Sequence, residues 1–128
     1  MDMKTNEVRN NDSRQRIIHF SEYQKAAVVT KKPWEEKALE IADCGLGLTG
    51  EAGEVADMLK KHISGSKLID SGERVEKLKY EVGDIMWYIA ALCDAIGFDM
   101  GEIAEMNIEK LRKRHGASFS GYGDRSGE

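Results

Sequence analysis

Apolar residues recur at intervals of three and four along most of the chain, a spacing that predicts helices rather than strands. The most regular stripe follows a predicted loop over residues 64–72 and consists of Val75, Leu78, Val82, Ile85, Ile89, Leu92 and Ile96. Gly97 then supplies a C-terminal stop. A second stripe predicts a helix from about Trp34 or Glu35 to Ile63, with Leu48, Ala52, Val55, Leu59 and Ile63 on one face.

Four glycines interrupt the second of these helices, at positions 45, 47, 50 and 53. Each costs about 1 kcal/mol relative to alanine in a helix interior, so their presence calls for a reason. One interpretation is close packing against a neighbouring helix, or a break near Gly50. The other is room for a ligand beside the backbone, and the sequence favours neither.

Two shorter helices flank this pair. Ser21 and Gln24 match a capping box, which predicts a helix that starts at Ser21 and ends before Pro33. A similar pattern at Asp99 and Glu102 predicts a last helix that carries Ala104, Ile108 and Leu111 on its inner face. Four helices and no strand signal predict an all-α fold, most simply a four-helix bundle.

The length of 128 residues suits one domain, which we expect to span residues 17–116. The polar segment 1–16 has no periodicity and is expected to form a flexible N-terminal arm. The Gly- and Ser-rich segment 117–128 is expected to form a mobile tail.

Composition narrows the class of protein further. With 41% hydrophobic and 33% charged residues, the chain suits neither a disordered segment nor a membrane protein. The net charge of −4 argues against nucleic acid as the main partner. The composition also leads us to expect no membrane partner. Cys44 and Cys93 lack the spacing of a zinc or redox motif, so we expect buried thiols in a reducing cytoplasm.

Two pairs of carboxylates stand out, Glu51 with Glu54 and Glu81 with Asp84. The i, i+3 spacing places both members of a pair on one helix face. The two pairs are also equidistant from the centre of the intervening loop, so an antiparallel hairpin would bring all four together. Four like charges at one place require raised pKa values or a bound cation, and an all-oxygen set favours Mg²⁺ or Mn²⁺.

The alternative is that these groups are solvated surface carboxylates paired with nearby lysines at 60, 61, 77 and 79. For a single pair that alternative is the better one, whereas two symmetric pairs favour a metal site. A di-iron site is disfavoured, because none of the three histidines follows a glutamate at i+3.

Asn107, Lys110 and Arg114 share one face of the last predicted helix, next to its apolar stripe. Such a row suits phosphate oxygens opposite a metal. It equally suits a basic helix C-terminus that complements the helix dipole, and spacing alone slightly favours this second interpretation.

These residues lie in strings that resemble the MazG-like, all-α nucleoside triphosphate pyrophosphohydrolases, in particular the short phage-type members. The strings are FSEYQKAAVVT, GLTGEAGEVADMLKK, KLKYEVGDIMWYIAAL and NIEKLRKRHG, and the resemblance spans about residues 19–116. It implies Mg²⁺-dependent hydrolysis of a nucleoside triphosphate, expected to be a deoxynucleotide, to the monophosphate and pyrophosphate. It also implies an obligate homo-oligomer, either a dimer or a dimer of dimers.

By motif match, the resemblance implies that Glu51, Glu54, Glu81 and Asp84 are metal ligands. It places Asn107 and Lys110 near the phosphates, and Arg114 less directly. Within that expectation, Glu51 or Glu54 takes the proton from a metal-activated water. The nucleobase is expected to stack on one of four aromatic side chains, which are Phe20, Tyr23, Trp34 and Trp87.

The apolar residues Met86, Trp87 and Tyr88 lie beyond the main stripe of their helix and suggest a homo-oligomeric interface. The uninterrupted apolar stripe of the same helix supports a rival hypothesis, a helical dimerisation module without chemistry. That rival gives no reason for carboxylates at matched heights. No motif in the chain indicates which base or sugar is preferred.

Overall fold

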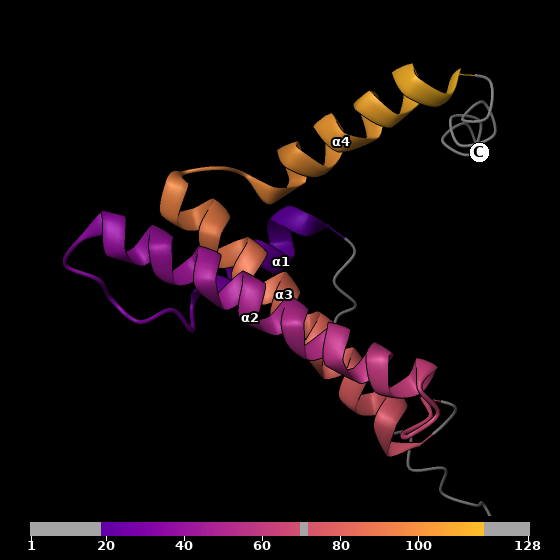
Figure 1. Ribbon diagram of the computed structural model, residues 1–128. Coiled ribbons are helices and arrows are strands. Elements are labelled where there is room, and N and C mark those ends of the chain that lie inside the picture. Colours follow the sequence, from indigo (N-terminus) through magenta and orange to yellow (C-terminus); the bar gives the residue numbers. More distant parts are fainter. Residues whose placement is uncertain (1–18, 70–71, 117–128) are drawn as a thin grey trace, which may run out of the picture.

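The computed structural model describes residues 19–69 and 72–116, and in this part of the chain it contains helices and no strand (Figure 1). The helices are α1 (Phe20–Val28), α2 (Lys37–Ile63), α3 (Glu73–Ile96) and α4 (Met100–His115). The all-α fold class with four helices is therefore confirmed. The predicted arm 1–16 and tail 117–128 lie outside the described residues.

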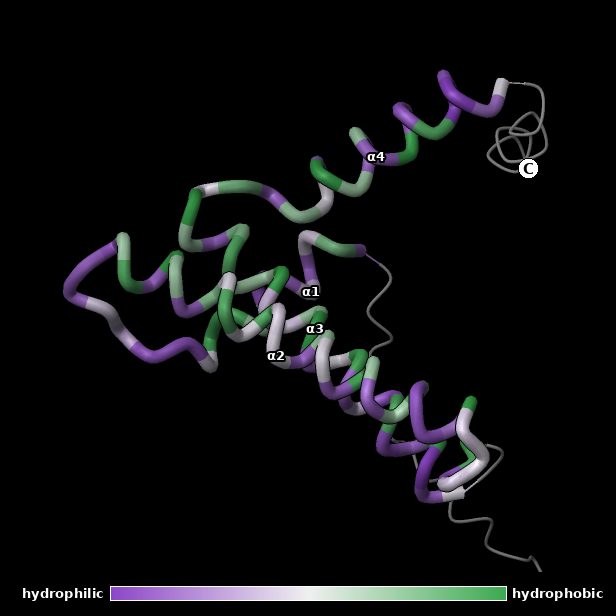
Figure 2. The backbone as a smooth tube through the Cα atoms, in the orientation of Figure 1, coloured by the Kyte–Doolittle hydropathy of each residue, from purple (hydrophilic) through white to green (hydrophobic). Residues whose placement is uncertain are grey.

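The long helices α2 and α3 form an antiparallel hairpin, which is the most extensive contact between elements. Green and purple stretches alternate along both helices in Figure 2, as their apolar stripes require. Helix α1 packs against α3, and α4 packs against α1. Figure 1 shows α4 projecting away from the hairpin, so the fourth helix contributes little to covering α2 and α3.

Small residues allow α2 and α3 to approach closely. Gly47 faces the ring of Tyr88, and a Cβ at this position would collide with that ring. Close packing is therefore the reason for Gly47. At Gly45, Gly50 and Gly53 a Cβ would meet nothing, and α2 continues through Gly50 without a break.

The capping box predicted at Ser21 and Gln24 does not form, because α1 starts at Phe20 and both residues are used in tertiary contacts. Ser21 Oγ donates to the Asp99 carboxylate at 2.8 Å. Gln24 donates through Nε2 to the Phe98 carbonyl and accepts from the Met100 amide. The two side chains thus fasten α1 to the turn between α3 and α4, where Asp99 is the N-cap as predicted.

Helix α2 begins at Lys37, later than the stripe predicts, because a charged linker precedes it (Figure 2). Lys31 of that linker donates to Glu40 of α2 at 2.5 Å and to Asp94 of α3 at 2.7 Å. Lys37 binds the other oxygen of Glu40 at 2.6 Å. This network ties the linker to the open end of the hairpin, which is the end opposite the loop.

The buried core is made mostly of small side chains, which include Ala90, Ala91 and both cysteines as free thiols, together with Met100. Within the described residues no large side chain is fully buried. Large apolar side chains are instead exposed on the hairpin, among them Leu59, Ile63, Val82 and Ile96. None of the described helices has the length and apolarity needed to cross a membrane.

Candidate active site

The register of the hairpin brings two of the four predicted ligands face to face. Gly47 of α2 packs on Tyr88 of α3. Glu51 follows Gly47 by one turn, and Asp84 precedes Tyr88 by one turn on the antiparallel helix. These two carboxylates therefore lie at the same height, as the symmetry of the sequence about the loop predicts.

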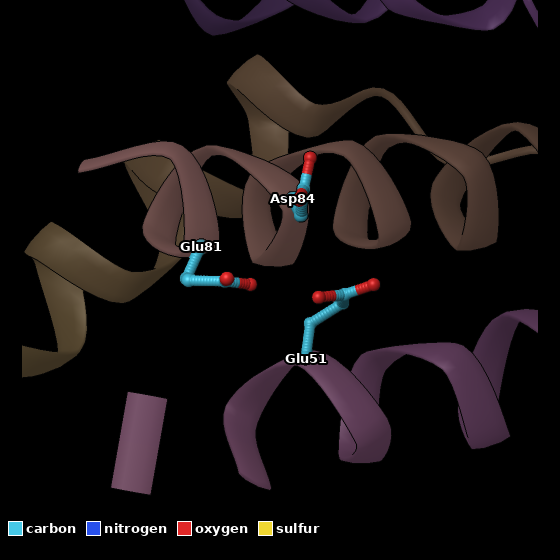
Figure 3. A group of neighbouring side chains, drawn as sticks. All are labelled: Glu51, Glu81 and Asp84. Atoms are coloured by element: carbon cyan, nitrogen blue, oxygen red, sulfur yellow. The ribbon is translucent and has the colours of Figure 1, made fainter. Parts of the chain in front are cut away.

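Three carboxylates meet at this height (Figure 3). Glu51, Glu81 and Asp84 each offer an oxygen, and these oxygens lie within 4.8 Å of one another. Glu51 reaches from α2 toward the other two, which come from successive turns of α3. Glu54 is not part of this group, although it lies one turn further along α2 and belongs to the same predicted set.

The charges of this carboxylate cluster are not neutralised by neighbouring lysines. Burial raises the pKa of Glu51, and the negative charges of Asp84, Glu81 and Glu54 raise it further. Of the four lysines that could have paired with the cluster, Lys61 binds Asp57 and Lys79 binds Glu76, and no ion pair among the described residues joins Lys60 or Lys77 to it. The alternative of surface carboxylates paired with lysines therefore finds no support at these three residues.

The cluster suits a divalent cation by its chemistry. Three converging carboxylate oxygens from two rigid helices form a hard, anionic donor set, which is the type that Mg²⁺ and Mn²⁺ prefer. A bound cation would also remove the like-charge repulsion that raises the pKa of Glu51. Glu51, Glu81 and Asp84 are thus the residues that could hold the metal.

An aromatic pocket lies beside the cluster, toward the open end of the hairpin. It has a volume of about 340 Å³, and its walls include Trp34 from the linker and Trp87 and Tyr88 from α3. Trp87 is fixed in place because its Nε1 donates to Thr30 Oγ1 at 2.7 Å and to the Ala27 carbonyl. Tyr88 packs edge-on against Trp87, with ring centroids 5.0 Å apart.

Two of the four predicted stacking residues therefore share one pocket, and the other two lie elsewhere. Phe20 lines a separate cavity between the starts of α1 and α4. Tyr23 packs against Cys93 and Met100, and burial raises its pKa, with a further contribution from the charge of Asp84.

A basic pocket lies on the other side of the cluster, toward the loop end of the hairpin. Its volume is about 110 Å³, and its lining includes Lys61, Lys67, Arg74 and Lys77 together with Glu54 and Asp57. The sequence pattern indicates Lys61 and Lys77 only as ion-pair partners, and it gives no role to Lys67 or Arg74. A signal was present, because Lys77 and Arg74 precede Glu81 by one and two turns on the same face of α3.

The predicted phosphate ligands of α4 are not near the cluster of the same chain. Asn107, Lys110 and Arg114 are exposed, on a helix whose main contact is with α1 (Figure 1). Lys110 lines a shallow cavity of about 540 Å³ on α4 itself, next to Met106 and Lys113. Within one chain, these residues and the carboxylate cluster are separate features.

Comparison with known proteins assigns the family. A sequence profile of the MazG nucleotide pyrophosphohydrolase domain matches residues 40–119, which is more than half of the chain and includes the whole cluster. The chain therefore belongs to the MazG nucleotide pyrophosphohydrolase domain family. This agrees with the resemblance that the helical strings carry.

One relative is itself a phage protein, the "Gene 37 protein" of Mycobacterium phage L5. It is 35% identical over 69 residues, which cover 54% of this chain and 60% of that protein. The match thus spans less than two thirds of the relative, whose name states no activity. No solved structure matches the chain.

Proposed function

We propose that this protein is a divalent-metal-dependent nucleoside triphosphate pyrophosphohydrolase, which splits its substrate into the monophosphate and pyrophosphate. The observation that carries the proposal is the order of three features along the α2–α3 hairpin. The carboxylate cluster lies between an aromatic pocket and a basic pocket. A nucleoside triphosphate has the same order of base and phosphates, and membership of the MazG family supports that substrate class.

Glu51, Glu81 and Asp84 would hold the metal, with Glu54 one turn away. When bound, Mg²⁺ or Mn²⁺ offsets the negative charge of the phosphates and makes a bound water more acidic. Glu54 is exposed and lies one turn from the cluster, so its carboxylate is free to accept the proton of the attacking water. We therefore assign Glu54 as the general base and Glu51 as a ligand.

The aromatic pocket would hold the nucleobase. Its volume of about 340 Å³ falls in the range of small-molecule sites. Trp34 and Trp87 offer flat apolar faces, and base stacking on such rings contributes about 1–3 kcal/mol per base. Lys31 lines the same pocket, and its ion pairs with Glu40 and Asp94 would hold the linker that carries Trp34.

The phosphates would have two sources of positive charge. Arg74 and Lys77 of the same chain lie on the loop side of the cluster and suit the leaving pyrophosphate. Asn107, Lys110 and Arg114 can reach a cluster only from a second copy, because α4 projects away from its own hairpin.

This geometry supports a homo-oligomer, a dimer or a dimer of dimers, in which α4 of one copy serves the site of another. The exposed apolar side chains on the hairpin would be covered in such an assembly. Trp87 and Tyr88 already contact α1 and Gly47 of their own chain, so we place the interface on the exposed apolar side chains of the hairpin instead.

The activity is tested with a panel of ribo- and deoxynucleoside triphosphates and Mg²⁺, with products separated by chromatography. We expect monophosphate and pyrophosphate, and no turnover with excess chelator. Release of the nucleoside diphosphate and inorganic phosphate would contradict the proposal. Complete inactivity, together with a melting temperature that does not change when Mg²⁺ is added, would favour the rival hypothesis of a dimerisation module.

Sharing of the site between copies is tested by mixing two inactive variants, Glu51→Gln and Lys110→Ala. If Lys110 acts on the cluster of a second copy, mixed oligomers contain some sites with both native residues and recover part of the activity. Lys110→Ala alone should lose turnover but keep its melting temperature, because an exposed lysine contributes less than about 1 kcal/mol to folding. No recovery on mixing, or a monomer in sedimentation at micromolar concentration, would exclude a shared site.

A further inference from the structure

The aromatic pocket contains a carboxylate that the proposed reaction does not use. Asp43 is the only acidic side chain among the residues that line the pocket. It is exposed, and in the described part of the chain it takes part in no hydrogen bond or salt bridge. The position is not at the metal cluster, because Asp43 precedes Glu51 by more than two turns of α2.

The other charged residues that line the pocket are already bound. Lys31 is held by Glu40 and Asp94, at 2.5 and 2.7 Å. The ammonium group of Lys32 lies over the Trp34 ring, 4.1 Å from its centroid. Asp43 is therefore the charged group that remains available to a ligand between the aromatic walls.

The carboxylate of Asp43 is also close to the aromatic wall. Burial raises the pKa of the Tyr88 phenol, and among the charged neighbours Asp43 contributes most to that rise, ahead of Glu51. Cys44, the next residue along α2, is buried and lines the same pocket together with Ala91 of α3. Asp43 thus lines the pocket beside its aromatic wall, and its carboxylate is available to the polar edge of a base stacked there.

A carboxylate accepts hydrogen bonds and donates none, so it discriminates between bases. Cytosine, adenine and guanine each carry an exocyclic amino group that can donate to it, whereas uracil and thymine carry only carbonyl oxygens as exocyclic groups, on either side of a single ring N3–H. Guanine offers a second donor beside its amino group. We propose that Asp43 selects nucleotides with an amino-bearing base and rejects uracil and thymine. This inference rests on the proposed nucleotide-binding function.

The test uses α,β-imido deoxynucleoside triphosphates of all five bases with Mg²⁺, since the bridge between the α and β phosphorus atoms cannot be hydrolysed. Binding is followed by the quenching of Trp34 and Trp87 fluorescence. The native protein should bind the amino-bearing analogues at least about tenfold more tightly than the uracil and thymine analogues. Asp43→Asn, whose amide can also donate to a carbonyl, should remove most of this difference.

Glu36→Gln is the matched control, because Glu36 is an exposed carboxylate just before α2 and does not line the pocket. It should keep the native preference. Equal binding of all five analogues, no binding of any, or an unchanged preference in Asp43→Asn would each overturn the inference. Hydrolysis of ordinary deoxynucleotides is measured separately, so that an active enzyme with an unselective Asp43 is distinguished from an inactive protein.

Discussion

Helix α2 carries two glutamates in opposite electrostatic situations, Glu40 near its start and Glu51 three turns later. The side chain of Glu40 is only 8% exposed, and lysines bind both of its oxygens. Hydrogen bonds from Lys31 and Lys37 lower its pKa below the ordinary value of 4.5. Glu51 has carboxylates as neighbours instead, and its pKa is raised above the same value.

Glu40 thus stabilises the fold, whereas Glu51 lies where a cation could bind. Around Glu40 every charge has an opposite partner, and the network joins the linker, α2 and α3. Around Glu51 the like charges repel one another, which costs stability in the metal-free protein. A fold keeps such a cluster where a function requires it, and the partner that we propose here is a cation.

The largest effect should come from Glu51→Gln. Loss of a metal ligand should lower kcat/KM more than a hundredfold, since even indirect supports of metal ligands contribute ten- to a hundredfold. The metal-free variant should melt at the native temperature or above it, because one repelling charge is gone. Glu40→Gln should behave in the opposite way, with a lower melting temperature and most of the activity retained. If both variants lost activity equally, the contrast between the two sites would be wrong.

Glu54→Gln tests the separation of ligand and base within the first carboxylate pair. Turnover should fall about a hundredfold or more, which is the range for loss of a general base. Mg²⁺ should still raise the melting temperature, by the equivalent of about 1.4 kcal/mol at ten times its Kd. In Glu51→Gln that response to Mg²⁺ should largely disappear. A variant Glu54→Gln that no longer responds to Mg²⁺ would make Glu54 a ligand instead.

Lys31→Ala should break the network and leave the cluster intact. We expect a loss of about 2 kcal/mol in the free energy of unfolding, which is less than for a fully buried pair because Lys37 still neutralises Glu40. Urea denaturation of the native protein and the variant measures this loss in the free energy of unfolding. Lys79→Ala is the control, since its pair with Glu76 is exposed and should contribute under about 1 kcal/mol. Equal losses in both variants would show that the network is an ordinary surface feature.

The smallest effect is a pH dependence of opposite sign at the two glutamates. The folded protein holds a proton on Glu51 more tightly than the unfolded chain does, so acidification from neutral pH toward 4.5 should stabilise the metal-free protein. The stability that Glu40 contributes is present above 4.5 and is lost as the pH falls below that value, through its lowered pKa.

Denaturation in chelator at a series of pH values measures both effects. Glu51→Gln should abolish the increase in stability on acidification from neutral pH toward 4.5. Mg²⁺ should suppress that increase in the native protein. Asp57 and Asp99, whose carboxyl pKa values are lowered by hydrogen bonds, add to the loss in strong acid. If the stability of the native protein falls steadily as the pH is lowered from neutral, with no increase, Glu51 is an ordinary surface carboxylate.

Periodicity and spacing determined much of this protein from sequence alone. The stripes predicted the helices to within a few residues, because an amphipathic face is a local property of one helix. The symmetry of the two carboxylate pairs about the loop predicted the register, and Glu51 does lie with Glu81 and Asp84. A hairpin with a short loop leaves little freedom of register, so here sequence separation translates directly into height.

The tertiary structure decided what depends on rotation about the helix axes and on contacts between distant segments. It separated Glu54 from the other carboxylates and brought Trp34 and Trp87 into one pocket without Phe20. It also showed that Ser21, which was expected to cap a helix, donates a hydrogen bond to Asp99 instead. A local pattern shows which residues share a face, but not which face meets which, because that choice depends on how well side chains far apart in the sequence pack against one another.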